Sequence, residues 1–167
     1  MPRIAVPDGT DPLIHLWTGL APGVARPAGA LSDAVYRRST LPLREFEAAR
    51  IAIAAINDCN VCLGWRTARD VPERAAADTG PEPDQAFYDD VLGPRVALTE
   101  RESLAVEFAE RFATDHLNLD DELWERLRSA FSDDELVDLA ICVGNWLAFG
   151  RVNRVFDVDG ACRVPQP

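Results

Sequence analysis

The stretch REFEAARIAIAAINDCNVC, residues 44–62, carries the strongest structural signal in this chain of 167 residues. Its first seven residues are good helix formers, and the alternating isoleucines and alanines that follow are apolar on every side of a helix. The same alternation is compatible with a strand, but the helix-forming residues in front of it favour a helix. We therefore predict a buried helix from Arg44 to Ile56.

Two cysteines, Cys59 and Cys62, follow this helix directly. We expect Asp58 to be the N-cap of a second helix that Cys59 opens and that continues through Arg69 and past Pro72. Cysteines three residues apart share one helical face and lie close enough to form a disulfide. The free N–H groups of a first turn favour a thiolate over a thiol. This pattern is typical of a redox-active dithiol, in which one thiolate attacks and its partner resolves the product.

Two charged residues accompany the pair in the predicted helices. Arg66 lies four residues after Cys62 on the same predicted face, where a guanidinium would stabilise a thiolate. Glu47 begins the buried helix, and partial burial would raise the proton affinity of its carboxylate so that it could relay a proton from a thiol. The simpler alternatives are a solvated charge at a helix start for Glu47 and an ordinary surface or salt-bridge residue for Arg66.

Upstream of this stretch, residues 1–30 hold five prolines and four glycines, which predicts an extended arm over the surface. Ser32 is expected to cap a short helix through Ser39. We expect a helical domain over residues 31–158 and a C-terminal tail over 159–167.

Downstream, the second half of the chain also has a helical pattern. A short helix is predicted at Gln85–Leu92. Capping boxes, in which a Thr or Ser precedes a Glu by three residues, mark two helix starts at Thr99 and Ser132. They predict helices at 100–113, 121–131 and 133–155. With no convincing strand, the predicted fold is an all-α bundle of about six to eight helices.

Composition excludes several function classes. A formal net charge of −11 without a basic run argues against nucleic acid and against anionic membrane surfaces. No signal peptide and no apolar run of about 20 residues are visible, so a cytoplasmic location is expected. In that compartment paired cysteines indicate catalysis, redox sensing or metal binding rather than a structural disulfide.

Zinc is the metal alternative, and it needs about four ligands. The other two cysteines, Cys142 and Cys162, lie 80 and 100 residues beyond Cys62 and lack a paired spacing. Cys142 falls within an apolar helix and is expected to be a core residue. We therefore predict no metal site.

A glutamate, eleven residues and then Cys-x-x-Cys resembles the active-site signature of the alkylhydroperoxidase D (AhpD) family, which belongs to the carboxymuconolactone decarboxylase-like superfamily. The resemblance covers about residues 30–158, including the stretch GRVNRV at 150–155. It implies an all-helical fold and a homo-oligomer, commonly a trimer or a multiple of it, with a dimer as the alternative.

The resemblance also implies a mechanism. Cys62 would attack a hydroperoxide, Cys59 would resolve the product, and Glu47 would head a proton relay. No bound cofactor is implied. An external dithiol, either a donor protein or a small thiol, would reduce the disulfide.

Two positions depart from the family pattern, because Val61 and Arg66 stand where the family usually has histidines. A guanidinium stays protonated at neutral pH and cannot shuttle protons. The sequence thus predicts a thiol-dependent, peroxidase-like antioxidant enzyme. The alternatives are a non-catalytic redox sensor or disulfide-exchange module and, third, a decarboxylase-type lyase, whose chemistry needs no neighbouring cysteines.

Overall fold

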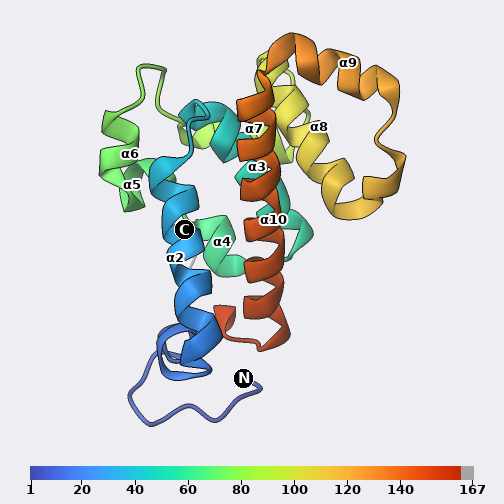
Figure 1. The fold of residues 1–167 in the computed structure, drawn as a ribbon. Coiled ribbons are helices and arrows are strands. Elements are labelled where there is room, and N and C mark those ends of the chain that lie inside the picture. The colour runs from blue at the N-terminus through green and yellow to red at the C-terminus, as the bar shows by residue number, and fades with distance from the viewer. Residues whose placement is uncertain (163–167) are drawn as a thin grey trace.

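The computed structural model describes the backbone of residues 1–162 and the side chains of residues 1–160, and this part of the chain is helical without a strand (Figure 1). The all-α prediction is confirmed. The described range holds ten α-helical segments, so the predicted six to eight is too low. The excess comes from short segments of three to five residues, among them α1 (Pro12–Ile14), α5 (Thr67–Asp70) and α6 (Pro72–Ala76). None of the helices described is both long and apolar enough to span a membrane.

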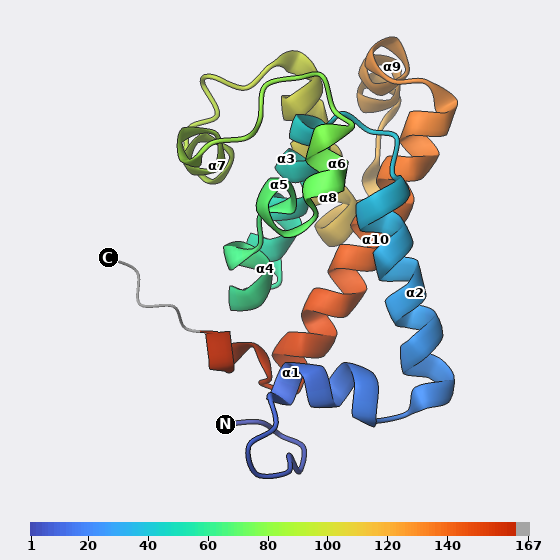
Figure 2. The ribbon, with the colours of Figure 1, turned by 90° about the vertical axis from the view of Figure 1, so that its left-hand side faces the viewer.

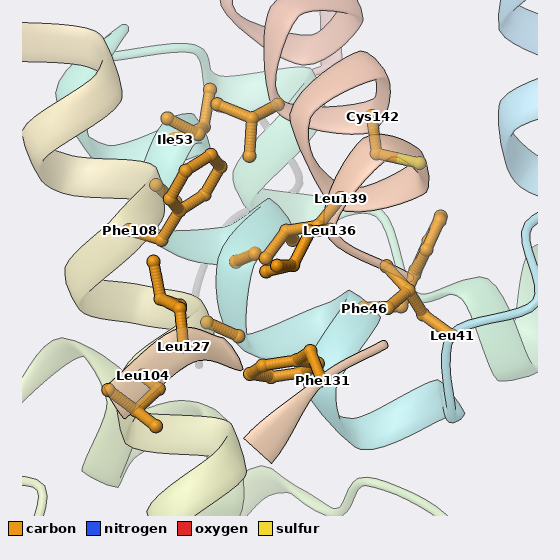
Figure 3. Packing of buried hydrophobic residues seen from close by; sticks show 14 of the residues in the cluster. Leu41, Phe46, Ile53, Leu104, Phe108, Leu127, Phe131, Leu136, Leu139 and Cys142 are labelled. Carbon is orange, nitrogen blue, oxygen red and sulfur yellow. The ribbon is translucent and has the colours of Figure 1, made fainter. Parts of the chain in front are cut away.

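Helix α3 (Leu43–Ile56) is buried along most of its length, which confirms the buried helix predicted from Arg44 to Ile56. One side of it packs against α8 (Glu100–Asp115) and α10 (Asp133–Val155), where the largest cluster of buried apolar side chains forms (Figure 3). The other side packs against α7 (Gln85–Leu92) through a second apolar cluster. Because both sides are covered, α3 is apolar nearly all round.

The two predicted capping boxes are present. Thr99 and Glu102 exchange hydrogen bonds at the start of α8, and Ser132 and Glu135 do the same at the start of α10. Helix α9 (Asp121–Ala130) lies between them. The helix predicted at 85–92 matches α7.

The predicted extended arm over residues 1–30 is wrong beyond about residue 11. Helix α1 is followed by a π-helical turn (His15–Gly19) and by α2 (Pro22–Arg38), which crosses the expected domain boundary at residue 31 and replaces the short helix expected from Ser32. Proline is favourable at the first position of a helix, which is where Pro12 and Pro22 stand, so these prolines start helices instead of excluding them.

Contacts with α10 hold this N-terminal segment in place. The indole Nε1 of Trp17 donates to the side chain of Asn153 at 2.8 Å, and the Trp17 ring lies 4.9 Å from that of Phe149. Figure 2 shows α1 close to the C-terminal end of α10, with α2 rising beside α10.

The cysteine helix is shorter than predicted. Helix α4 spans Asn60–Gly64, Cys59 rather than Asp58 is its N-cap, and Asp58 has a left-handed backbone (φ 49°). The predicted continuation through Arg69 is wrong because the chain is extended at Trp65 and Arg66. At this helix end the carbonyls of Cys62, Leu63 and Trp65 accept hydrogen bonds from arginine side chains instead of from helical N–H groups.

The expected tail begins in a packed turn. Residues Asp159–Cys162 form a 3-10 turn that contacts α4, and both Val158 and Asp159 are buried. The side chain of Cys162 and all of residues 163–167 lie outside the described part of the chain.

Candidate functional site

Cys59 and Cys62 form a disulfide, with 5.3 Å between their Cα atoms. The predicted proximity of the two cysteines is therefore confirmed. Their surroundings differ: Cys59 is fully buried, whereas Cys62 is partly exposed and lines a cavity. The backbone N–H of Cys62 points to the Sγ of Cys59 at 3.4 Å. Only Cys62 can thus meet a molecule that enters the cavity.

The cavity has a volume of about 410 Å³ and lies between α2, α4 and α10. Its wall is mostly aromatic and apolar, with side chains from distant parts of the sequence. The aromatic members are Trp17, Tyr36, Trp65, Trp146 and Phe149. An organic molecule with an apolar body fits such a lining.

Polar atoms of three cavity residues have no hydrogen-bond partner among the described residues. They are two indole donors, Nε1 of Trp65 and Nε1 of Trp146, and one acceptor, Oδ1 of Asn145. Trp146 and Asn145 are 6% and 5% exposed. These atoms are themselves buried, so they do not present a polar surface to the cavity.

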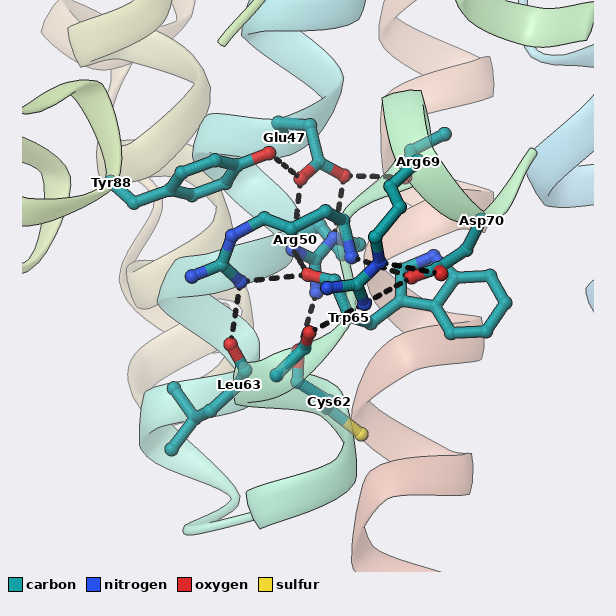
Figure 4. Close-up of polar contacts among 11 residues, drawn as sticks. Glu47, Arg50, Cys62, Leu63, Trp65, Arg69, Asp70 and Tyr88 are labelled. Atoms are coloured by element: carbon teal, nitrogen blue, oxygen red, sulfur yellow. Dashed lines mark hydrogen bonds and ion pairs between the residues drawn. The ribbon is translucent and has the colours of Figure 1, made fainter. Parts of the chain in front are cut away.

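Next to the cysteine segment, Glu47 and Arg50 form a buried ion pair (Figure 4). Nε and Nη2 of Arg50 donate to the two carboxylate oxygens of Glu47 at 2.6 and 2.9 Å. The hydroxyls of Thr67 and Tyr88 donate to the same carboxylate at 2.5 Å each. Glu47 is 0% and Arg50 1% exposed. The four hydrogen bonds donated to the Glu47 carboxylate therefore replace those that water would make to it at the surface.

The expected rise in the proton affinity of Glu47 is wrong. Burial alone would raise the pKa of its carboxyl, but the charge of Arg50 and the hydrogen bonds from Arg50, Thr67 and Tyr88 outweigh burial and lower the pKa. Burial and the neighbouring carboxylate in turn raise the pKa of the Tyr88 hydroxyl. Both groups therefore resist changing their protonation state near neutral pH.

Arg50 connects this ion pair to the cysteine helix. Its Nη1 donates to the carbonyl of Cys62 at 2.7 Å, and its Nη2 donates to the carbonyl of Trp65 at 2.9 Å. Arg50 also lines the cavity beside Cys62. Glu47 thus acts on the cysteine segment through Arg50, and its own hydrogen bonds go to Arg50, Thr67 and Tyr88.

Arg66 lies outside the helix that carries the cysteines, so the predicted shared face does not exist. Its guanidinium donates to the carbonyls of Leu63 and Trp65 and stacks over the Tyr88 ring at 3.9 Å. These contacts hold the turn after α4. A role for Arg66 at the thiol stays a prediction for which these contacts offer no support.

Sequence reasoning missed Arg50, Thr67, Tyr88 and Asp159. Arg50 left a signal, because an arginine in a helix that is apolar on every side must have a partner, and Glu47 lies one turn earlier. Asp159 left none, since it follows the last predicted helix. It is fully buried, and its carboxylate accepts the Asn60 N–H at 3.2 Å.

No group of three or more metal-binding side chains occurs within the described range. Cys142 is buried in the core, as expected. Burial and the nearby Asp138 carboxylate raise the pKa of its thiol. Cys142 is thus a core residue. The side chain of Cys162, the other cysteine considered as a zinc ligand, lies outside the described part of the chain.

Comparisons with known proteins support the fold. No family model matches the chain, and no curated protein matches it. Among solved structures, the chain is similar to a protein of unknown function from Agrobacterium tumefaciens that is provisionally named antioxidant defence protein AhpD. The TM-score is 0.64 at 22% identity, over 84% of this chain and 92% of that one. The fold is therefore AhpD-like.

Proposed function

We propose that the chain is a thiol-dependent, peroxidase-like oxidoreductase that reduces organic hydroperoxides, with Cys62 as the attacking cysteine and Cys59 as the resolving one. The observation that carries this proposal is the difference between the paired sulfurs: Cys62 lines the cavity and Cys59 is fully buried.

The proposed cycle balances in three steps. The Cys62 thiolate attacks the hydroperoxide, the O–O bond breaks, and the products are a Cys62 sulfenic acid and an alkoxide, which takes a proton from water to become an alcohol. The Cys59 thiol then displaces water and forms the disulfide. An external dithiol returns both cysteines to thiols and becomes a disulfide itself. No bound cofactor or metal takes part in this scheme.

Arg50 is the proposed positioning residue. Its guanidinium holds the carbonyls on either side of the α4 end, which fixes where the Cys62 side chain leaves the helix. It is also the buried cation of the cavity wall, which favours a thiolate nearby, although its pairing with Glu47 offsets much of its field. We assign to Glu47 the fixing of Arg50, in place of the proton relay that the resemblance implies.

The cavity supports an organic substrate rather than hydrogen peroxide. Its aromatic wall would bury an apolar substituent of the substrate. Hydrogen peroxide would leave the apolar wall unused and gain none of this binding energy.

Disulfide exchange is the second candidate, because the ionised Glu47 offers no proton for the leaving alkoxide. In that case Cys62 would attack a disulfide of another molecule, and the leaving thiolate would need no general acid. A sensor would use the same exchange without turnover.

The rate at which the reduced protein is oxidised, measured by stopped flow, separates these functions. Cumene hydroperoxide and a small-molecule disulfide are compared as oxidants, with Cys62→Ser and Cys142→Ala as the test and control variants. The proposal expects fast oxidation by the hydroperoxide in wild type and Cys142→Ala and none in Cys62→Ser. Oxidation no faster than that of a free thiol, together with fast reaction with the disulfide, would favour exchange.

A further inference from the structure

The outer face of α10 has an apolar strip that this chain leaves uncovered. Val137, Ile141 and Val155 are 59%, 51% and 60% exposed. Figure 1 shows α10 running down the front of the molecule without a helix drawn over it. Between Asp134 and Arg151 the exposed residues of α10 are Val137, Ile141 and Ala148, which are all apolar, although the chain as a whole is strongly acidic.

The strip follows the spacing of a helix–helix seam. Successive members are separated by four, three, four, three and four residues, which is the heptad pattern of a coiled coil. These positions are Val137, Ile141, Gly144, Ala148, Arg151 and Val155. A solvent-facing helix side normally carries polar residues there, so the pattern indicates a partner helix.

Gly144 adds an independent observation. It lies in the middle of a helix of 23 residues, where glycine is a poor helix former. A Cβ atom built on Gly144 would have no neighbour within 4 Å, so packing inside the chain does not require glycine here. A closely approaching second helix would require it.

The charges at the two ends of the strip identify the partner. Asp133 and Asp134 are exposed at its start and Arg151 is exposed at its end. A second α10 that runs antiparallel brings Arg151 of each copy toward Asp134 of the other, whereas a parallel pair sets like charges together. The strip is therefore complementary to itself under a twofold rotation.

We propose that this face of α10 binds the same face of a second copy of the chain, antiparallel, about a twofold axis near Gly144. In the resulting dimer Val137 and Ile141 pack against Ala148 and Gly144 of the other copy. Because the opposite side of α10 lines the cavity, the interface would support the cavity wall from behind. The proposal does not depend on the thiol chemistry.

Sedimentation velocity over a dilution series of the full chain tests the interface. We expect a reversible dimer, and Ile141→Glu should raise its dissociation constant by more than about tenfold, because a charge would be buried without a partner. Leu117→Glu is the matched control, since Leu117 is 85% exposed and lies off α10, and it should leave the constant unchanged. Circular dichroism checks that both variants fold.

A charge exchange tests the antiparallel direction. Arg151→Glu should weaken the dimer, and the double variant Asp134→Arg with Arg151→Glu should restore it, because the reversed charges again face each other. A wild-type monomer at every concentration would overturn the proposal. So would an oligomer of any size that survives Ile141→Glu, and failure of the double variant to rescue would overturn the antiparallel pairing.

Discussion

Glu47 and Arg50 form a buried ion pair, and Arg50 also donates hydrogen bonds to the carbonyls of Cys62 and Trp65. Replacing Glu47 by Gln keeps the shape of the side chain but leaves the Arg50 charge buried without its partner. We expect a loss of about 3–5 kcal/mol in the free energy of unfolding, measured by urea denaturation at neutral pH. Glu110→Gln is the control, because the Arg95–Glu110 pair is more than a third exposed and should cost less than about 1 kcal/mol. Equal losses in the two variants would contradict this role.

The same pair predicts a pH dependence. The folded protein holds the pKa of Glu47 below its ordinary value of 4.5, so acid protonates this group in the unfolded chain first. The stability advantage of wild type over Glu47→Gln should be complete above that value and should fall as the pH drops through the lowered pKa. Urea denaturation from pH 7 downward measures it. If the advantage of wild type grew on acidification, the pKa of Glu47 would be raised in the folded protein, as the sequence suggested.

Burial also distinguishes the two cysteines in the reduced protein. In a background of Cys142→Ala and Cys162→Ser, iodoacetamide should modify Cys62 faster than Cys59 by on the order of tenfold, because Cys59 is fully buried. Peptide mass spectrometry over time gives both rates. Preferential labelling of Cys59 would reverse the assigned roles.

Among the elements, the contact between α10 and the end of α3 positions the cysteine segment. The Asn57 side chain donates to the carbonyl of Trp146 at 3.0 Å, and its Nδ2 occupies the space where a Cβ on Gly150 would lie. Gly150→Ala should therefore destabilise the protein by about 1–3 kcal/mol. Gly29→Ala in α2 meets no neighbouring atom and should be neutral or stabilising. Thermal unfolding measures the stability of both variants. Equal changes in stability would show that the close approach of Asn57 to Gly150 does not require glycine.

The elements that sequence predicted best are those with local signals. The capping boxes at Thr99 and Ser132 locate α8 and α10, and the helix formers before Ile51 locate α3. The cysteine spacing predicted the disulfide partners. The end of α4 was not predictable, since it depends on Arg50 reaching carbonyls 12 and 15 residues away. The helices before residue 31 were missed because Pro12 and Pro22 stand at helix starts, where proline is favourable, and because α2 also contains Pro27 in its interior.

At the scale of the whole molecule, the N-terminal segment and α10 form the cavity together with the cysteine segment. Trp17 and Phe149 pack on each other in its wall, so removing one ring should affect bulky substrates most. We expect Phe149→Ala to lower kcat/KM for cumene hydroperoxide by about tenfold or more, with a smaller effect for hydrogen peroxide. Steady-state peroxide consumption with excess dithiothreitol measures both. Equal losses for the two substrates would exclude the cavity as the binding site.

The central claim is that Cys62 is the cysteine that attacks the peroxide. The most direct test uses the reduced Cys59→Ser variant, in which a sulfenic acid cannot be resolved by its partner. One equivalent of cumene hydroperoxide is added in the presence of dimedone, and peptide mass spectrometry locates the adduct. The account predicts dimedone on Cys62. An adduct on another cysteine, or none at Cys62 while the peroxide is consumed, would contradict it.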